Sequence, residues 1–343
     1  MDTTTLQLLW FVLLGVLLAG YAILDGFDLG VGILFPLARS EPERRALMSS
    51  IAPLWDGNEV WLVVFGGALF AAFPRAYAAA FSGFYLAFML LLFCLIFRGV
   101  SLEFRNKQPG RIWRRTWGWA FFASSTLATF LFGITVGNSM HGLPLAPDGD
   151  FAHPIRLPDL FHPYALCVGL FAVAAFALHG AIYLYGKTEG ELEKRAHRWA
   201  WSSFAAFLTL YLVVTVYTLV AMPHATDNFR QYPWTWTVVI LNVLAIANIP
   251  RSIYLRRPRR AFLSSASTIA AFTFLFGMSL FPNMIVSSLG HETDLTIARA
   301  ASSEKTLGIM AFIAALGVPF VLAYTVVIYW VFRGRVKLTE SSY

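Results

Sequence analysis

Long apolar stretches separated by short polar connections dominate the chain. A helix needs about 20 mostly apolar residues to cross the hydrocarbon of a bilayer. Nine stretches approach or exceed that length: Leu6–Leu37, Asp56–Phe73, Ala78–Phe97, Thr116–Val136, Tyr164–Tyr185, Trp199–Met222, Trp234–Tyr254, Ala261–Phe281 and Leu307–Phe332. The pattern therefore predicts an all-α integral membrane protein with about nine transmembrane helices.

Basic residues are distributed unevenly among the connections. Those after the first, third, fifth and seventh predicted spans, with the C-terminal tail, hold 21 of the 26 Lys and Arg residues. These are Arg39, Arg44, Arg45, Arg98, Arg105, Lys107, Arg111, Arg114, Arg115, Lys187, Lys194, Arg195, Arg198, Arg251, Arg256, Arg257, Arg259, Arg260, Arg333, Arg335 and Lys337. Because cytoplasmic loops are rich in Lys and Arg, we expect the N-terminus outside and the C-terminus in the cytoplasm.

Composition agrees with a membrane protein. Hydrophobic residues make up 58% of the chain and charged residues 13%, where soluble proteins usually have about 25% charged residues. No polar linker is long enough to separate two domains, so we expect a single transmembrane domain over residues 1–343. The net charge of +7 follows from the cytoplasmic loops, so no nucleic-acid partner is indicated and contact with anionic lipid is a side effect.

Several common sites have no support in the sequence. Cys94 and Cys167 lie in apolar spans without a CxxC or CxxCH pattern, so we expect them to be small buried residues. No H-x-x-x-H, Walker or G-x-G-x-x-G motif is present, which removes support for zinc, nucleotide or dinucleotide sites. The N-terminal stretch has no basic residue before its apolar part and is predicted to stay as a helix rather than to be a cleaved signal.

Two carboxyl groups lie within the first predicted span, at Asp25 and Asp28. Their spacing places both on one helix face. Since neighbouring anions repel and a bilayer disfavours charge, at least one carboxyl is expected to bind a proton near neutral pH. Such a pair suits proton uptake and release; the alternative is that it braces the inner end of a long helix. Gly26 and Gly30 form a GxxxG pattern, which predicts close helix packing.

The second span opens with the string Trp55-Asp56-Gly57-Asn58-Glu59-Val60-Trp61. One interpretation is a capping box, with Asp56 as N-cap and Glu59 three residues later. The other is an acidic, hydrated inlet on the cytoplasmic side. The first span descends to that side and the second rises from it, so the four carboxyls are expected at a similar depth. Trp61, one turn inside, fits an interfacial belt less well than the other tryptophans do.

His179 is the only histidine within a predicted span. Haem buried in a helix bundle needs axial His or Met ligands from facing helices. One buried histidine is poor provision, so we expect the chain to bind no haem or other metal itself. We interpret His179 as a polar contact or a member of a proton path, and haem ligation through it is the alternative.

Several strings resemble subunit II of the cytochrome bd-type quinol oxidases. They are Asp25-Gly-Phe-Asp-Leu-Gly-Val-Gly32, Ser50-Ile-Ala-Pro-Leu-Trp-Asp-Gly-Asn58, Gly66-Gly-Ala-Leu-Phe-Ala-Ala-Phe-Pro74 and Tyr77-Ala-Ala-Ala-Phe-Ser-Gly-Phe-Tyr85. Weaker similarities follow at Gly137-Asn138, at Gly277-Met-Ser-Leu-Phe-Pro282 and at Ser287-Ser288. The match is dense over residues 1–105 and collinear afterwards.

The resemblance implies a fold, a complex and an activity. The fold would be two four-helix bundles, residues 1–137 and 162–281, with a ninth peripheral helix at 307–333. The chain would form a heterodimer with subunit I, which holds haem b and haem d, and would itself bind no haem. The complex would oxidise quinol, reduce dioxygen to water and build a proton gradient without pumping, in the bacterial cytoplasmic membrane. Small single-helix subunits and a structural quinone are left open.

The resemblance also implies roles for particular residues. The Trp-Asp-Gly-Asn motif would line a cytoplasmic proton route with Asp56 as its main carboxyl, and Trp61 would lie near a lateral oxygen route. With the inferences above, the candidate proton pathway consists of Asp25, Asp28, Asp56, Asn58, Glu59 and His179, and the candidate oxygen route or motif residues are Trp55 and Trp61. Glu59 departs from the family, where an amide is common, and the segment Pro223–Pro233 is short.

A proton-coupled secondary transporter is the competing interpretation, with Asp25, Asp28 and Asp56 as the coupling carboxyls. Such transporters bind substrate near the bilayer midplane at broken helices. The carboxyls here are instead predicted toward the inner side, which favours the oxidase subunit.

Overall fold

Helices make up most of this computed structural model, which describes residues 2–146 and 151–336. The helices in that part are α1 (Thr3–Leu34), α2 (Glu41–Ile51), α3 (Trp55–Ala72), α4 (Pro74–Gly83), α5 (Tyr85–Phe104), α6 (Arg111–His141), α7 (Pro163–Lys187), α8 (Gly190–Ala221), α9 (Asp227–Gln231), α10 (Trp236–Tyr254), α11 (Pro258–Leu280), α12 (Ile297–Ala300) and α13 (Glu304–Val331). Two short antiparallel strands, β1 (Asn283–Ile285) and β2 (Leu295–Thr296), complete them.

Eight helices of the described chain are long and apolar enough to cross a membrane: α1, α5, α6, α7, α8, α10, α11 and α13. They confirm the predicted all-α membrane protein. The remaining predicted span, Asp56–Phe73, falls on α3, which packs along α1. With 18 residues α3 is about 27 Å long. Its polar first turns, with Asp56, Asn58 and Glu59, lower its hydropathy.

The third predicted span was wrong at both ends. Instead of Ala78–Phe97, the structure has the short helix α4, a break at Phe84 and the membrane helix α5. Pro74 starts α4 because its fixed φ suits the first helical position. α4 as a whole is less apolar than the membrane helices, but its run Ala78–Phe81 is followed closely by the apolar start of α5, and the two were joined into one predicted span. Arg98, which we counted as a loop residue, lies inside α5.

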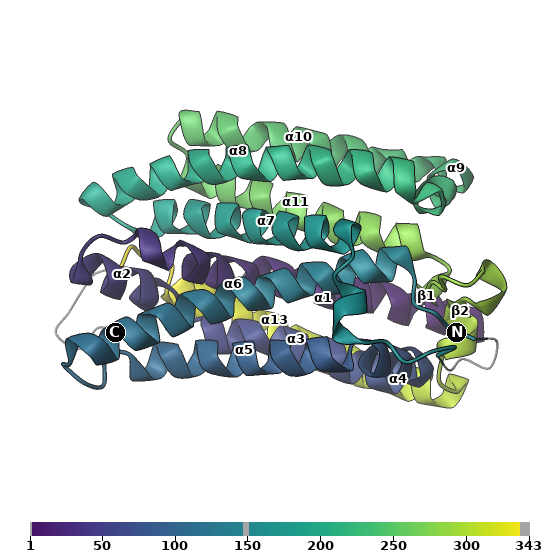
Figure 1. Cartoon of the computed structure of the whole chain (residues 1–343). Coiled ribbons are helices and arrows are strands. Elements are labelled where there is room, and N and C mark those ends of the chain that lie inside the picture. The colour runs from purple at the N-terminus through teal and green to yellow at the C-terminus, as the bar shows by residue number, and fades with distance from the viewer. Residues whose placement is uncertain (1, 147–150, 337–343) are drawn as a thin grey trace.

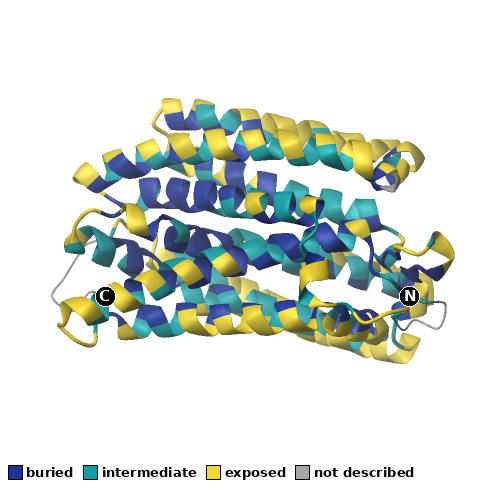
Figure 2. Ribbon diagram, viewed as in Figure 1, coloured by how far each residue is buried: buried dark blue, intermediate teal, exposed yellow. Residues whose placement is uncertain are grey.

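The helices pack in layers around α1, which contacts α3, α6, α7, α11 and α13. In Figure 1, α8 and α10 form one outer layer, α7 and α11 the next, and α3, α5 and α13 lie on the far side of α1 and α6. Figure 2 shows α7 mostly buried, while α8 and α10 are exposed along their outer sides. Such apolar outer faces suit contact with lipid.

The predicted packing face of α1 is confirmed at Gly30. A Cβ atom built there would lie 2.0 Å from the carbonyl oxygen of Phe176 and 2.9 Å from the backbone of Gly180. Only a glycine allows α1 and α7 to approach this closely. The division into bundles at 1–137 and 162–281, with a ninth helix at 307–333, stays a prediction.

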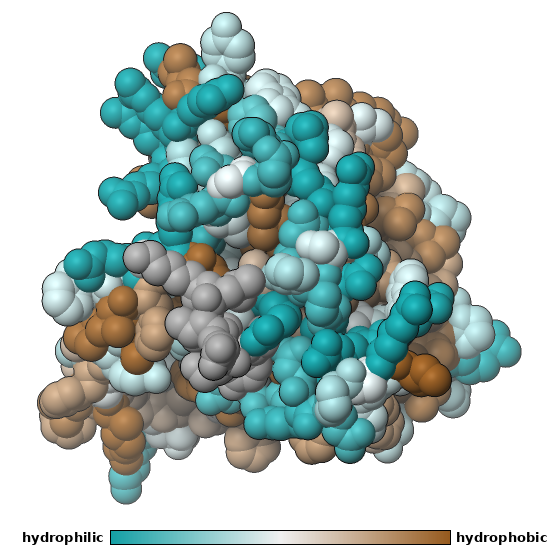
Figure 3. Space-filling model, turned by 90° about the vertical axis from the view of Figure 1, so that its left-hand side faces the viewer, coloured by the Kyte–Doolittle hydropathy of each residue, from teal (hydrophilic) through white to brown (hydrophobic). Residues whose placement is uncertain are grey.

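The basic connections gather at one end of the molecule, called the basic end below (Figure 1). It holds α2, the α5–α6, α7–α8 and α10–α11 connections and the described end of the chain; Lys337 lies outside the described residues. This face is largely hydrophilic (Figure 3). Glu41 of α2 pairs with Arg105 at 2.8 Å and Glu43 with Arg195 at 2.7 Å, so α2 links α5 to α8. Which side of the membrane this end faces stays a prediction.

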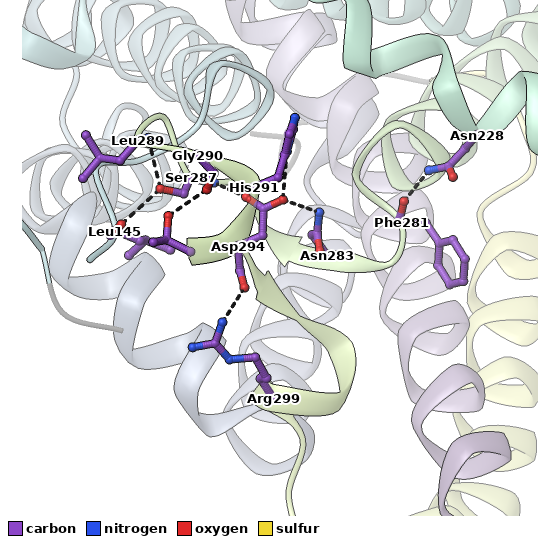
Figure 4. Close-up of polar contacts among 11 residues, drawn as sticks. Leu145, Asn228, Phe281, Asn283, Ser287, Leu289, Gly290, His291, Asp294 and Arg299 are labelled. Atoms are coloured by element: carbon purple, nitrogen blue, oxygen red, sulfur yellow. Dashed lines mark hydrogen bonds and ion pairs between the residues drawn. The ribbon is translucent and has the colours of Figure 1, made fainter. Parts of the chain in front are cut away.

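The opposite end is closed by β1, β2 and the segment between them. Asp294 organises this segment (Figure 4): its carboxylate accepts hydrogen bonds from the Asn283 side chain at 2.8 Å and from the Ser287 backbone N–H at 2.7 Å. Its own carbonyl oxygen accepts from Arg299 at 3.0 Å. Asp294 is buried, so these bonds satisfy a charge that would otherwise be costly to bury.

Candidate functional site

α1 carries Asp25 and Asp28 into the interior of the protein. Their relative exposures are 0% and 1%. They are one turn apart on a helix that neighbouring helices surround, so both carboxyls face protein and not lipid. The predicted proximity of these two carboxyls is therefore present in the structure.

Arg98 of α5 lies between two carboxylates. One of its guanidinium nitrogens, Nη1, donates to Asp25 Oδ1 at 2.6 Å, and the other, Nη2, donates to Glu59 Oε2 at 3.0 Å. Arg98 is fully buried, so its charge depends on these partners. The pairing joins α1, α3 and α5 at one point.

Asn58 of α3 connects Asp28 to the peripheral helix α13. Its amide nitrogen donates to Asp28 Oδ2 at 2.7 Å and to the Leu24 carbonyl oxygen at 3.1 Å. Its amide oxygen accepts from the Tyr329 hydroxyl at 2.9 Å. The Leu24 carbonyl oxygen can only accept a hydrogen bond, so the amide atom of Asn58 that faces it must be the nitrogen. The same amide nitrogen is then the donor to Asp28.

The side chains of this cluster include more acidic groups than basic ones. Three carboxyls (Asp25, Asp28 and Glu59) face one cation, Arg98. Asp25 and Glu59 share that cation, whereas Asp28 receives only a neutral amide donor. Asp25 Oδ2 and Asp28 Oδ1 are buried without a hydrogen-bond partner among the described residues. Excess negative charge in a low-dielectric interior is relieved by binding a proton, so the arrangement can hold and release protons.

Asp56 is not part of this cluster. Its side chain is exposed on the outer surface of the chain, and no hydrogen bond joins it to Asp25 or Asp28 in the described structure. The capping-box alternative is wrong, since the residue at the N-cap of α3 is Leu54 and it makes no side-chain cap. Glu59, whose side chain is 22% exposed, is the member that connects the buried cluster to the surface.

Trp55 and Trp61 pack against glycines on neighbouring helices. A Cβ atom on Gly20 of α1 would lie 2.3 Å from the Trp61 ring, and one on Gly99 of α5 would lie 3.1 Å from the Trp55 ring. Both glycines thus leave room for an indole. Trp55 of α3 therefore packs over the α5 backbone next to Arg98. Trp61 of α3 packs against α1 at Gly20, about one turn before Asp25.

His179 is buried, and both of its ring nitrogens have partners. Nδ1 is 2.9 Å from the Ser265 hydroxyl and Nε2 is 3.0 Å from the Ile23 carbonyl oxygen. With both nitrogens engaged, the ring is not free to ligate haem iron. Its described hydrogen bonds join α7 to α11 and α1, and none goes to a carboxylate. Among the described residues no group of three or more His, Cys, Asp or Glu side chains could hold a metal ion.

Two members of the cluster were missed from the sequence. Arg98 follows an apolar run and was counted with the loop charges, although the apolar residues Val100, Leu102 and Phe104 beyond it continue the helix. That continuation is the available signal. Tyr329 is an ordinary interfacial tyrosine in sequence, and its contact with Asn58 depends on where α13 packs.

Three comparisons place the chain among known proteins. Residues 6–332 match the family model of cytochrome bd terminal oxidase subunit II. The chain is 35% identical to cytochrome bd-I ubiquinol oxidase subunit 2 of Escherichia coli (strain K12), over 98% of this chain and 96% of that protein. It is 32% identical to cytochrome bd ubiquinol oxidase subunit 2 of Bacillus subtilis (strain 168), over 97% of each.

A solved structure gives the same fold. A chain of the bd oxidase from Geobacillus thermodenitrificans matches with a TM-score of 0.79 and 18% sequence identity, over 96% of this chain and 98% of that one. At this identity the likeness supports the fold alone.

Proposed function

The chain belongs to the cytochrome bd terminal oxidase subunit II family, and on that premise we propose that it is the subunit without haem in a quinol:oxygen oxidoreductase of the respiratory chain. Its partner is a subunit I, which would carry haem b and haem d and oxidise quinol. The role of this chain is to stabilise that partner and to supply protons for the reduction of dioxygen to water. The engaged nitrogens of His179 support the absence of haem here.

The acidic cluster would conduct the protons. Protons enter at the basic end through Glu59, the partly exposed carboxyl that shares Arg98 with Asp25. Asp25, held at 2.6 Å from the guanidinium, acts as a fixed anion. Asp28, which receives only the Asn58 amide, is the group that binds and releases the proton. This assignment follows from the difference between a charged and a neutral donor.

Asp56 would lie where the two subunits meet. It is exposed on α3, a helix whose outer side is otherwise apolar, with Val60 and Val63 exposed nearby. A carboxyl on an apolar membrane face needs a polar partner. We assign α3 and the exposed face of α5 to the contact with subunit I, and Asp56 to the continuation of the proton route there. Trp61, on the same helix, is assigned to the oxygen route.

The proposal rests on the burial of the Asp28 carboxyl beside a neutral amide donor, and replacement of Asp28 tests it. We expect Asp28→Asn to slow turnover of the assembled oxidase at least about tenfold, because a positioned proton carrier is lost, while haem content stays normal. Asp227→Asn, on an exposed residue of α9, is the control and should leave turnover unchanged. Full turnover of Asp28→Asn would remove the proton role. Asp56→Asn tests in the same way the continuation of the route toward subunit I.

A further inference from the structure

The last turn of α10, its connection to α11 and the first turn of α11 carry five arginines, called the arginine turn below: Arg251, Arg256, Arg257, Arg259 and Arg260. All five are exposed at the basic end. They flank the N-terminus of α11, a helix of 23 residues whose dipole adds a partial positive charge there. The proposed proton route does not use them.

Within the described chain these arginines have no carboxylate partner, whereas several other basic residues at the same end do. Arg105, Arg195, Lys194 and Arg335 at the same end each form an ion pair. None of the side chains of the arginine turn forms a hydrogen bond or ion pair within the described chain. Glu189, the N-cap residue of α8, and Glu193 in its first turn lie at the same end and already pair with Arg335. The positive charge of the turn is therefore available to an external anion.

The backbone holds the turn in one shape. Arg256 has a left-handed conformation with φ of 54°, where glycine is the usual residue. The N–H of Arg257 donates to the Ser252 carbonyl oxygen at 2.9 Å, which closes the end of α10. A non-glycine residue held in this conformation costs stability and so points to a use for its side chain.

Apolar surface continues directly from the arginines into the membrane region. Leu263, four residues after Arg259 on the same face of α11, is 65% exposed. On α10, Ala247 and Leu244 continue the exposed face that begins at Arg251. Each helix thus places an arginine next to an exposed apolar strip. This arrangement is complementary to a phospholipid, whose phosphate lies next to its acyl chains.

We propose that the arginine turn binds the phosphate headgroup of an anionic phospholipid in the leaflet at the basic end. Arg256, Arg257, Arg259 and Arg260 contact the phosphate, and the acyl chain lies along Leu263 and the exposed face of α10. Guanidinium groups suit phosphate because they donate two parallel hydrogen bonds. The exposed apolar strips favour a lipid over a soluble polyanion. The site is independent of the acidic cluster.

Native mass spectrometry of the assembled oxidase, titrated with phosphatidylglycerol and with phosphatidylcholine, tests this. We expect Arg259→Gln/Arg260→Gln to bind phosphatidylglycerol about thirty-fold more weakly, from the usual contribution of two basic residues at an anionic surface. The control variant Lys194→Gln/Arg198→Gln also removes two positive charges at the basic end, where Lys194 already pairs with Glu191. It should change the affinity for phosphatidylglycerol by less than about twofold. Equal weakening by both variants, or by neither, would overturn the site.

Two further measurements separate the lipid site from misfolding and from plain phosphate binding. Arg256→Gly should leave the complex as stable as before or more so, since glycine accepts the left-handed backbone, yet bind phosphatidylglycerol about fivefold more weakly. An unchanged affinity would contradict the proposal. Excess inorganic phosphate should not displace the bound lipid, because it lacks the apolar contacts. Displacement would assign the turn to phosphate alone and overturn the lipid.

Discussion

Arg98 of α5 and Asp25 of α1 form an ion pair with 2.6 Å between Nη1 and Oδ1, and neither side chain is exposed. Folding removes both charges from water, and the attraction between them offsets the free-energy cost of burying each one. The pair also ties two membrane helices at the depth of the acidic cluster. A buried pair of this kind is costly to break from one side only.

The first prediction concerns the removal of only one charge of this pair. Arg98→Gln should destabilise the folded subunit by about 3–5 kcal/mol, because Asp25 is left as an uncompensated buried anion. We expect a lower temperature of thermal unfolding and reduced assembly of the complex. Arg98→Gln/Asp25→Asn removes both charges and should recover much of the loss. Equal stability of the single variant and the native complex would show that the pair is not coupled.

The sequence allowed most of the fold to be predicted, because membrane helices are specified by local apolar length. The break at Phe84 escaped because the apolar run Ala78–Phe81 of α4 is followed within a few residues by the apolar start of α5, although α4 as a whole is less apolar than a span. Within the site, Asp25 and Asp28 were located from spacing on one helix. Arg98 and Asp56 were not, because their depth and exposure depend on how α3 and α5 pack against α1, and no local pattern encodes that packing.

The second prediction concerns Tyr329, whose hydroxyl donates to Asn58 at 2.9 Å. Tyr329→Phe leaves the Asn58 amide oxygen without its donor and loosens the amide that donates to Asp28. Since one hydrogen bond contributes about 1 kcal/mol, we expect turnover of the assembled oxidase to fall roughly fivefold. Tyr324→Phe, on an exposed residue of the same helix, is the control. If both variants turn over equally, Tyr329 has no part in the cluster.

The third prediction concerns the crossing of α1 and α7. Gly30→Ala places a methyl group 2.0 Å from the Phe176 carbonyl oxygen, so the helices must separate. We expect a loss of roughly 1–3 kcal/mol in stability, measured as a lower unfolding temperature of the complex. Gly15→Ala, on the same helix with nothing within 4 Å, should be neutral or slightly stabilising. Similar behaviour of the two variants would refute the close-packing interpretation.

The last prediction concerns His162, which caps α7 just outside the membrane span. Its Nδ1 accepts a hydrogen bond from the Ala165 backbone N–H at 3.4 Å, so the cap requires the neutral ring. Burial, and then the nearby His141 ring at 4.4 Å, lower the pKa of His162 below its usual value. The unfolded chain therefore binds this proton at a higher pH than the folded chain does.

The sign of the pH effect follows from that difference. Above the usual histidine pKa of about 6.5 both states are neutral and His162 adds no pH dependence. Below it the unfolded state binds more protons, so stability falls as the pH drops. We expect the unfolding temperature to decrease between about pH 7.5 and about pH 5.5, and His162→Asn, which keeps a cap acceptor without titrating, to reduce that decrease. An equally steep decrease in the variant would place the titrating group elsewhere.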